Sequence, residues 1–154
     1  MKKAIVILVL FTFVLNACKS KSKAAEKPKI EVVEPTTVDK VKKDKAYALG
    51  KRVLMTCNTS KFKPFSKSEA TESVIQNTTL ERLTSTCRKF RIKYGDFKDI
   101  KLAQVIHNMN DDSYVFRYKA EYQRTFVTKE LRVTINNENK VSAIKSTDWT
   151  DEYK

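Results

Sequence analysis

The chain has 154 residues, a formal net charge of +13 and only two glycines, Gly50 and Gly95. Loops that cradle dinucleotides or phosphates need closely spaced glycines, so Rossmann and P-loop sites are excluded. One histidine and three cysteines are too few for a histidine-rich metal site or a four-cysteine zinc site within one chain, so neither a metal nor a cofactor is expected.

The first residues of the chain have the organisation of a secretory signal peptide. Two lysines follow the initiator methionine and precede the apolar run AIVILVLFTFVL, which at about a dozen residues is too short to span a bilayer comfortably. The next residues, Leu15, Asn16, Ala17 and Cys18, resemble the lipobox of bacterial lipoproteins. In that motif the cysteine thiol receives a diacylglycerol group, and a peptidase cuts the chain on the N-terminal side of the cysteine.

The lipobox resemblance implies a signal peptide at residues 1–17 and lipidation of Cys18. Burial of each acyl methylene contributes about 0.8 kcal/mol, so an anchor with more than one chain holds a protein stably on a membrane that it does not cross. The alternative is an ordinary signal peptide cut near Ala17, which leaves Cys18 as a free thiol. Because Lys19 is not the aspartate that retains some lipoproteins at the inner membrane, the resemblance implies attachment to the outer membrane of the cell envelope, facing the periplasm.

Residues 18–43 are predicted to form a basic, disordered tether. The segment mixes Lys, Glu, Ser and two prolines without a sustained apolar period. Its lysines either contact anionic headgroups beside the anchor or keep the spacer solvated.

Removal of the leader takes away two lysines and leaves a net charge of +11. Export from the cytoplasm and the lack of a recognised motif argue against nucleic acid as a partner; the expected partners are the membrane and an unknown envelope protein or small ligand.

Three helices are predicted at the start of the folded part. Apolar residues at helical spacing indicate an amphipathic helix from Asp44 to Cys57. A capping-box pattern at Ser66 favours a short helix that runs to about Ile75. A second such pattern at residues 78–81 opens the clearest helix, in which Leu80, Leu83, Cys87, Phe90 and Tyr94 repeat at helical spacing before Gly95 ends it.

Strands follow the helices, because the apolar period changes from helical to two. Residues 113–123, SYVFRYKAEYQ, alternate apolar and polar side chains, as a half-buried strand does. Further strands are predicted at residues 97–109, 127–135 and 140–149. Residues 44–154 are therefore predicted to form one α+β domain, in which two or three N-terminal helices pack on a curved antiparallel sheet of about four strands.

The element order, the strand of alternating tyrosines and the closing stretch ENKVSAIKSTDW resemble the small nuclear-transport-factor-2-like or cystatin-like domains of many bacterial lipoproteins of unknown function. The resemblance covers roughly residues 44–153. In that fold a curved sheet wraps around helices and forms a conical cleft. The resemblance therefore implies a pocket but does not indicate what binds there.

Two cysteines remain if Cys18 carries lipid. Cys57 and Cys87 lie on the apolar faces of the two main predicted helices and are predicted to form a disulfide in an oxidising periplasm. The alternative is a pair of buried free cysteines that act as small apolar side chains.

Several side chains have both a functional and a structural interpretation. His107 is a general base in the cleft or a structural residue of a strand, and Asp96 and Asp99 are acid–base groups or caps of the helix-to-strand turn. One aromatic set either lines a ligand cleft or packs in the core. That set comprises Tyr114, Phe116, Tyr118, Tyr122 and Trp149.

The sequence leaves three functional hypotheses open. The first is a lipid-anchored, non-enzymatic envelope protein whose α+β domain binds another protein or a small ligand. The second is an isomerase-like enzyme whose cleft uses His107 or an aspartate as base. The third is an inhibitor that neutralises a partner protein.

Overall fold

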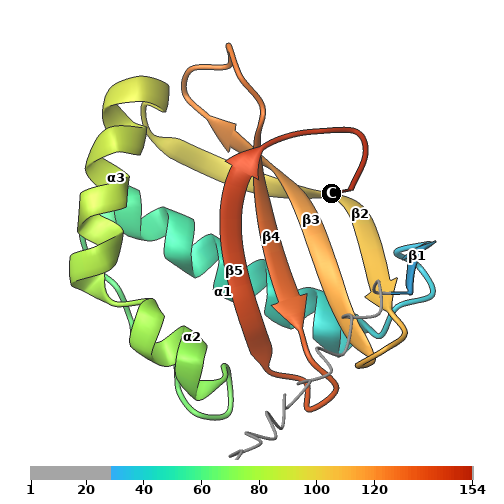
Figure 1. Cartoon of the computed structure of the whole chain (residues 1–154). Coiled ribbons are helices and arrows are strands. Elements are labelled where there is room, and N and C mark those ends of the chain that lie inside the picture. The colour runs from blue at the N-terminus through green and yellow to red at the C-terminus, as the bar shows by residue number, and fades with distance from the viewer. Residues whose placement is uncertain (1–28, 154) are drawn as a thin grey trace, which may run out of the picture.

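The computed structural model of the chain describes residues 29–153, which form helices on one face of a single sheet (Figure 1). The predicted signal peptide and the predicted lipidation site, Cys18, lie outside the described residues. The α+β class is confirmed, with a curved antiparallel sheet. The elements in chain order are β1 Ile30–Val33, α1 Lys40–Thr59, α2 Glu72–Asn77, α3 Leu80–Tyr94, β2 Phe97–Asn108, β3 Ser113–Tyr122, β4 Lys129–Ile135 and β5 Val141–Asp148.

The five strands follow one another in the sheet in the order of the sequence, and every neighbouring pair is antiparallel. The four predicted strands correspond to β2–β5. Two register shifts along β2, at Phe97–Asp99 and at Leu102–Gln104, are irregularities of the kind that bends a strand.

The prediction of a disordered tether up to residue 43 is wrong for its last part. Ile30–Val33 forms β1 and pairs with the end of β2, Ile30 opposite Asn108. Helix α1 begins at Lys40 rather than at Asp44, because the side chain of Asp39 caps it by accepting hydrogen bonds from two backbone amides of the first turn. A four-residue strand has too short a pattern to be detected, and its hydrogen bonds come from the edge of β2. The fold therefore begins by Ile30.

The other two helices begin later than their capping patterns indicate. The Ser66 amide does donate to the Glu69 carboxylate, at 2.9 Å, but these residues form a turn, and α2 begins only at Glu72. Helix α3 is capped by Thr79, whose hydroxyl accepts from the Arg82 amide. Gly95 ends α3 with a φ of 76°, as predicted.

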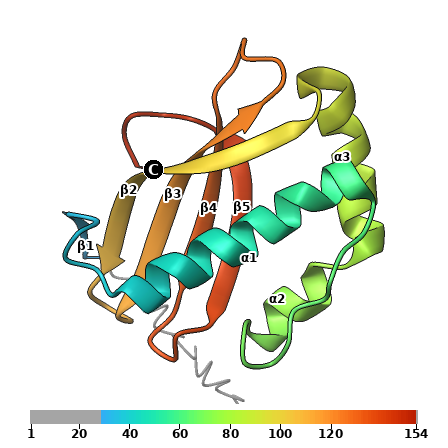
Figure 2. The same cartoon turned by 180° about the vertical axis from the view of Figure 1, so that it is seen from behind.

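Helix α1 crosses one face of the sheet, and α3 packs beside α1 rather than over the centre of the sheet (Figure 2). Alternate residues of β3 face the helices and are buried in the core, among them Phe116, Tyr118, Ala120 and Tyr122. The remaining core comes chiefly from α1, β2 and β4. Among residues 29–153, every helix and strand lies within residues 30–148.

Gly50 lets the backbone of α1 approach the sheet closely. A Cβ atom at this position would lie 2.8 Å from Cδ2 of Leu131 and 2.9 Å from Cγ2 of Val133. Both side chains belong to β4 and are fully buried, so an added Cβ atom would overlap core atoms and force the helix or these side chains to shift. The glycine is needed for packing, although glycine is a poor helix former.

We expect Gly50→Ala to destabilise the domain. Alanine improves helix propensity by up to about 1 kcal/mol, but overpacking a filled core costs about 1–3 kcal/mol. The free energy of unfolding, measured by urea denaturation, should fall by about 1–2 kcal/mol.

Ala48, exposed on the same helix, gives a matched control. Ala48→Gly should lose about 0.5–1 kcal/mol through helix propensity alone. If Gly50→Ala increased stability, propensity would outweigh packing and the close contact with β4 would not matter.

Candidate functional site

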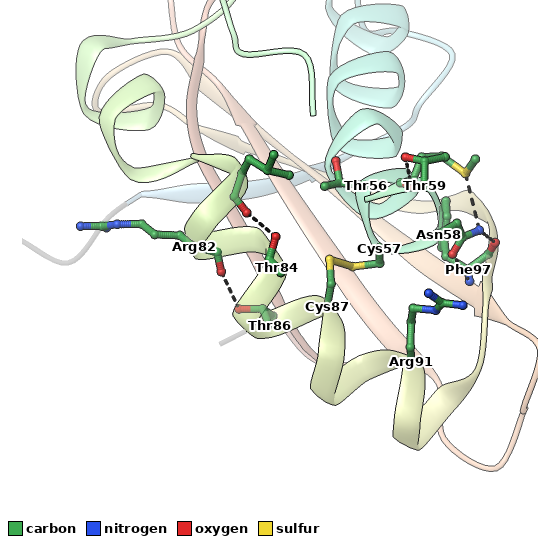
Figure 3. Close-up of a disulfide and its surroundings, with 12 residues drawn as sticks. Thr56, Cys57, Asn58, Thr59, Arg82, Thr84, Thr86, Cys87, Arg91 and Phe97 are labelled. Atoms are coloured by element: carbon green, nitrogen blue, oxygen red, sulfur yellow. Dashed lines mark hydrogen bonds between the residues drawn. A yellow bond between two sulfur atoms is a disulfide. The ribbon is translucent and has the colours of Figure 1, made fainter. Parts of the chain in front are cut away.

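A disulfide joins the C-terminal part of α1 to the middle of α3. Sγ of Cys57 lies 2.07 Å from Sγ of Cys87, and the two Cα atoms are 4.7 Å apart. Figure 3 shows the bond between the two helices. The predicted pairing is therefore present in the structure. Only Cys87 and Tyr94 of α3 are buried, so the disulfide is a principal attachment of this helix to the rest of the domain.

The end of α1 next to the disulfide is fixed to the start of β2. The side-chain amide of Asn58 donates to the Phe97 carbonyl at 2.7 Å, and its oxygen accepts from the Phe97 amide at 3.0 Å (Figure 3). This double contact places the disulfide end of α1 relative to the sheet. It also satisfies backbone groups at the first residue of a strand.

An apolar pocket of about 180 Å³ lies between α1, α3 and the last two strands. The half-buried side chains of Leu83 and Phe90 reach it from α3, while Leu131 forms part of its wall on the sheet. Among the residues that line the pocket, only Thr86 and Ser146 carry side-chain hydroxyl groups. The lining residues are Val53, Leu54, Cys57, Leu83, Thr86, Cys87, Phe90, Leu131, Ile144 and Ser146.

The predicted aromatic row does not line this pocket. Phe116, Tyr118 and Tyr122 are almost fully buried and pack in the core, with Tyr114 half-buried against it. Burial also raises the pKa of the Tyr118 and Tyr122 hydroxyls. The core interpretation of these four residues is the one that agrees with the structure.

His107 lies far along the sheet from the pocket, at the end of β2. Its Nε2 is 2.8 Å from Oδ1 of Asp112, and its ring stacks on Tyr114 with 4.4 Å between centroids. Lys42, near the start of α1, lies over the same tyrosine ring, whereas the pocket adjoins the other end of α1. The structure thus does not bring His107 together with the pocket.

Asp96, in the turn from α3 to β2, and Asp99, which lies within β2 rather than in the turn, also have other partners. Asp96 lies 3.2 Å from Nε of Arg91. Asp99 accepts from the Tyr47 hydroxyl at 2.9 Å and lies 3.0 Å from Nζ of Lys51. Burial raises the pKa of Asp99, but hydrogen bonds from the Ile100 amide, Lys51 and Tyr47 outweigh burial and lower it.

The opposite face of the sheet contains a buried ion pair that the sequence did not indicate. Arg117 and Glu130 form two hydrogen bonds, of 2.6 Å and 2.9 Å, and both side chains are fully buried. Arg132 adds a 2.6 Å contact to the same carboxylate. Burial raises the pKa of Glu130, but the two guanidinium groups outweigh burial and lower it.

The C-terminal segment covers this ion pair. The Thr150 carbonyl accepts a hydrogen bond from Arg117 at 2.6 Å, and the Trp149 ring lies 4.4 Å from the same guanidinium. Tyr153 lies over Arg132 at 4.9 Å. Trp149 therefore packs on the face away from the helices, as a structural cover of the ion pair.

We expect the double variant Cys57→Ala/Cys87→Ala to be less stable than the parent chain. The disulfide closes a loop with a sequence separation of 30, which corresponds to about 3–4 kcal/mol in the chain-entropy description. The free energy of unfolding is to be measured with and without dithiothreitol. The reductant should destabilise the parent chain and leave the double variant unchanged; equal stability of the parent chain under both conditions would show that no disulfide forms.

Comparison of the chain with protein families, with curated proteins and with solved structures finds no match. Among residues 29–153, none of the helices has the length and apolar character needed to cross a bilayer. In the same part of the chain, no group of three or more histidine, cysteine, aspartate or glutamate side chains is placed to hold a metal ion.

Proposed function

We propose that this protein is a lipid-anchored, non-enzymatic cell-envelope protein whose α+β domain binds one apolar group of a partner protein or small ligand. The binding function is inferred from the pocket between α1, α3 and β5, whose walls are almost entirely apolar. In such pockets, apolar walls provide the affinity and a few polar groups orient the occupant.

The size of the pocket limits what it holds. An apolar cavity of about 150 Å³ is enough to bind benzene, whereas sites for drug-sized ligands measure about 300–1,000 Å³. At about 180 Å³, this pocket suits a single aromatic ring or branched aliphatic group. Burial of one such group contributes about 1.5–3 kcal/mol, which alone is weaker than millimolar binding. Contacts outside the pocket are therefore needed, which favours a protein partner over a small free ligand.

The residues around the pocket favour binding over the alternative of an isomerase-like enzyme. That alternative places His107 or an aspartate in the cleft as a base, and neither lines this pocket. The inhibitor hypothesis is a special case of partner binding and would use the same apolar contact.

Anchoring through Cys18 would keep the domain close to the membrane. The fold begins by Ile30, twelve residues after Cys18. A fully extended chain of that length spans at most about 40 Å. Twelve residues are about half as many as the predicted tether of residues 18–43 contains. The start of the fold at Ile30 would therefore remain within about 40 Å of the lipid surface.

The pocket can be tested with benzene as the probe. We expect benzene to shift the amide NMR resonances of Leu83, Cys87 and Ile144 in a purified chain of residues 19–154. Ser146→Phe places a ring in the pocket and should weaken benzene binding by about tenfold or more. The matched control is Thr147→Phe, because the next residue of a strand points to the opposite face; this variant should bind benzene normally. Normal binding by Ser146→Phe, or shifts confined to another region, would contradict the proposed pocket.

The anchor can be tested in cells of the source organism. Cys18→Ser should move the protein from the membrane fraction to the soluble fraction and abolish incorporation of labelled fatty acid, because only a thiol accepts the diacylglycerol group. The Cys57→Ala/Cys87→Ala variant is the control and should remain attached. Membrane fractionation that Cys18→Ser leaves unchanged, with no lipid label in the parent chain, would refute the anchor.

A further inference from the structure

We propose that the folded domain has a second membrane-binding surface, which binds anionic lipid without a covalent anchor. It lies where α3 ends beside the loop that joins β3 to β4 (Figure 1). We call it the basic tip. Its residues are Arg88, Lys89, Ile92, Lys93, Arg124 and Phe126.

The outer face of α3 presents an exposed isoleucine among cations. Ile92 is 70% exposed, which is unusual for an isoleucine. Arg88 and Lys89 precede it by four and three residues and therefore share its face of the helix, and both are exposed. The opposite face of α3 carries Cys87 and Tyr94, which are buried. Ile92 is thus directed away from the core that this helix helps to form.

The loop between β3 and β4 adds a second exposed apolar side chain at the same end of the domain. Phe126 is 61% exposed, and its ring stacks on Tyr94 of α3 at 5.7 Å. Arg124 Nη1 donates to the Ile92 carbonyl at 2.8 Å, and the Arg124 amide donates to the Tyr94 carbonyl at 2.9 Å. These contacts hold Phe126 and Ile92 on one end of the domain.

The charge of the tip is complementary to an anionic surface. Arg88, Lys89, Lys93 and Arg124 are all exposed. Two acidic residues lie near the tip, and both already have cationic partners: Asp96 pairs with Arg91, and Asp148, whose pKa Lys129 and Lys93 lower, pairs with Lys129. Each lysine or arginine near an anionic bilayer strengthens binding by about fivefold.

A bilayer offers both of the environments that the tip needs. Anionic headgroups attract the cations, and the boundary with the acyl chains takes up exposed apolar side chains, which is the arrangement of interfacial basic helices. Single-stranded nucleic acid binds aromatic rings by stacking, which gives no role to the aliphatic side chain of Ile92. The occupant that fits both kinds of side chain is an anionic lipid surface.

The experiment is co-sedimentation of a chain of residues 19–154 with vesicles. This chain lacks Cys18 but retains every described element and the disulfide, so failure of the lipid anchor or of the pocket would not affect the result. We expect binding to vesicles of equimolar phosphatidylcholine and phosphatidylglycerol at low salt. Binding should weaken at high salt and on vesicles of phosphatidylcholine alone.

Two double variants separate the charged part of the tip from the apolar part. Lys89→Gln/Lys93→Gln should weaken binding by about 25-fold, as two cations at about fivefold each. Ile92→Ser/Phe126→Ser should weaken it by about tenfold or more, because both side chains lose their contact with the acyl boundary. Circular dichroism and thermal unfolding will show that these exposed substitutions leave the fold intact.

Lys67→Gln/Lys145→Gln is the matched control, because it removes two exposed lysines outside the tip and should change binding by less than about twofold. If the control weakened binding as much as Lys89→Gln/Lys93→Gln, binding would depend on net charge alone, and the proposal would be overturned. Unchanged binding of the Ile92→Ser/Phe126→Ser variant would also overturn it. Failure to bind phosphatidylglycerol vesicles would overturn it as well, and would leave an acidic protein as the partner of this surface.

Discussion

The contact between the backbone of α1 at Gly50 and the β4 side chains Leu131 and Val133 determines how the layers of this domain are arranged. Helix α1 packs directly on β2 and β4, whereas α3 packs mainly on α1. The height of α1 above the sheet therefore sets the position of the disulfide at Cys57, and the disulfide sets the position of α3. One close approach of helix and sheet thus positions the whole side of the molecule that carries the pocket.

The pocket exists because α3 cannot close onto the sheet. Most of its residues are polar or charged, and only Cys87 and Tyr94 are buried. Such a helix has too little apolar surface to pack tightly on two layers. With the disulfide holding its middle against α1, Leu83 and Phe90 project over β5 without filling the space beneath them. An incompletely closed interface of this kind leaves apolar surface that an apolar group of another molecule can contact.

The sequence predicted the elements that have long, regular patterns and missed those that depend on distant partners. The alternation along residues 113–123 identified β3 and its buried face correctly. The same alternation counts Arg117 among the polar side chains of the strand, but the fold buries it, because the chain after β5 crosses that face and places Trp149 on the guanidinium. The four residues of β1 are too few to show a period, so they were assigned to a tether.

The candidate site was only partly predictable for a similar reason. Counting the cysteines and placing them on apolar helix faces was sufficient for the pairing of Cys57 with Cys87. The location of the pocket could not be predicted from the sequence. It depends on the distance between α3 and β5, and no local pattern encodes that distance. The tyrosines of β3 were candidates for lining a ligand cleft because of their chemistry. In the structure they belong to the core instead: Tyr118 lies beside Tyr47 of α1, and Tyr122 packs against α3.

The start of the fold at Ile30 also matters for avidity. If Cys18 is held in a bilayer, the twelve residues up to β1 keep the domain at a high effective concentration next to lipid. A contact between the basic tip and lipid that is too weak to hold a free domain on a membrane would then be strengthened, because the tether makes this second binding event effectively intramolecular. Since β1 pairs with the end of β2, whereas α3 ends next to the start of β2, two such attachments would lay the long axis of the sheet along the membrane. The pocket would then be presented at a fixed orientation, so that a partner would meet it from one side only.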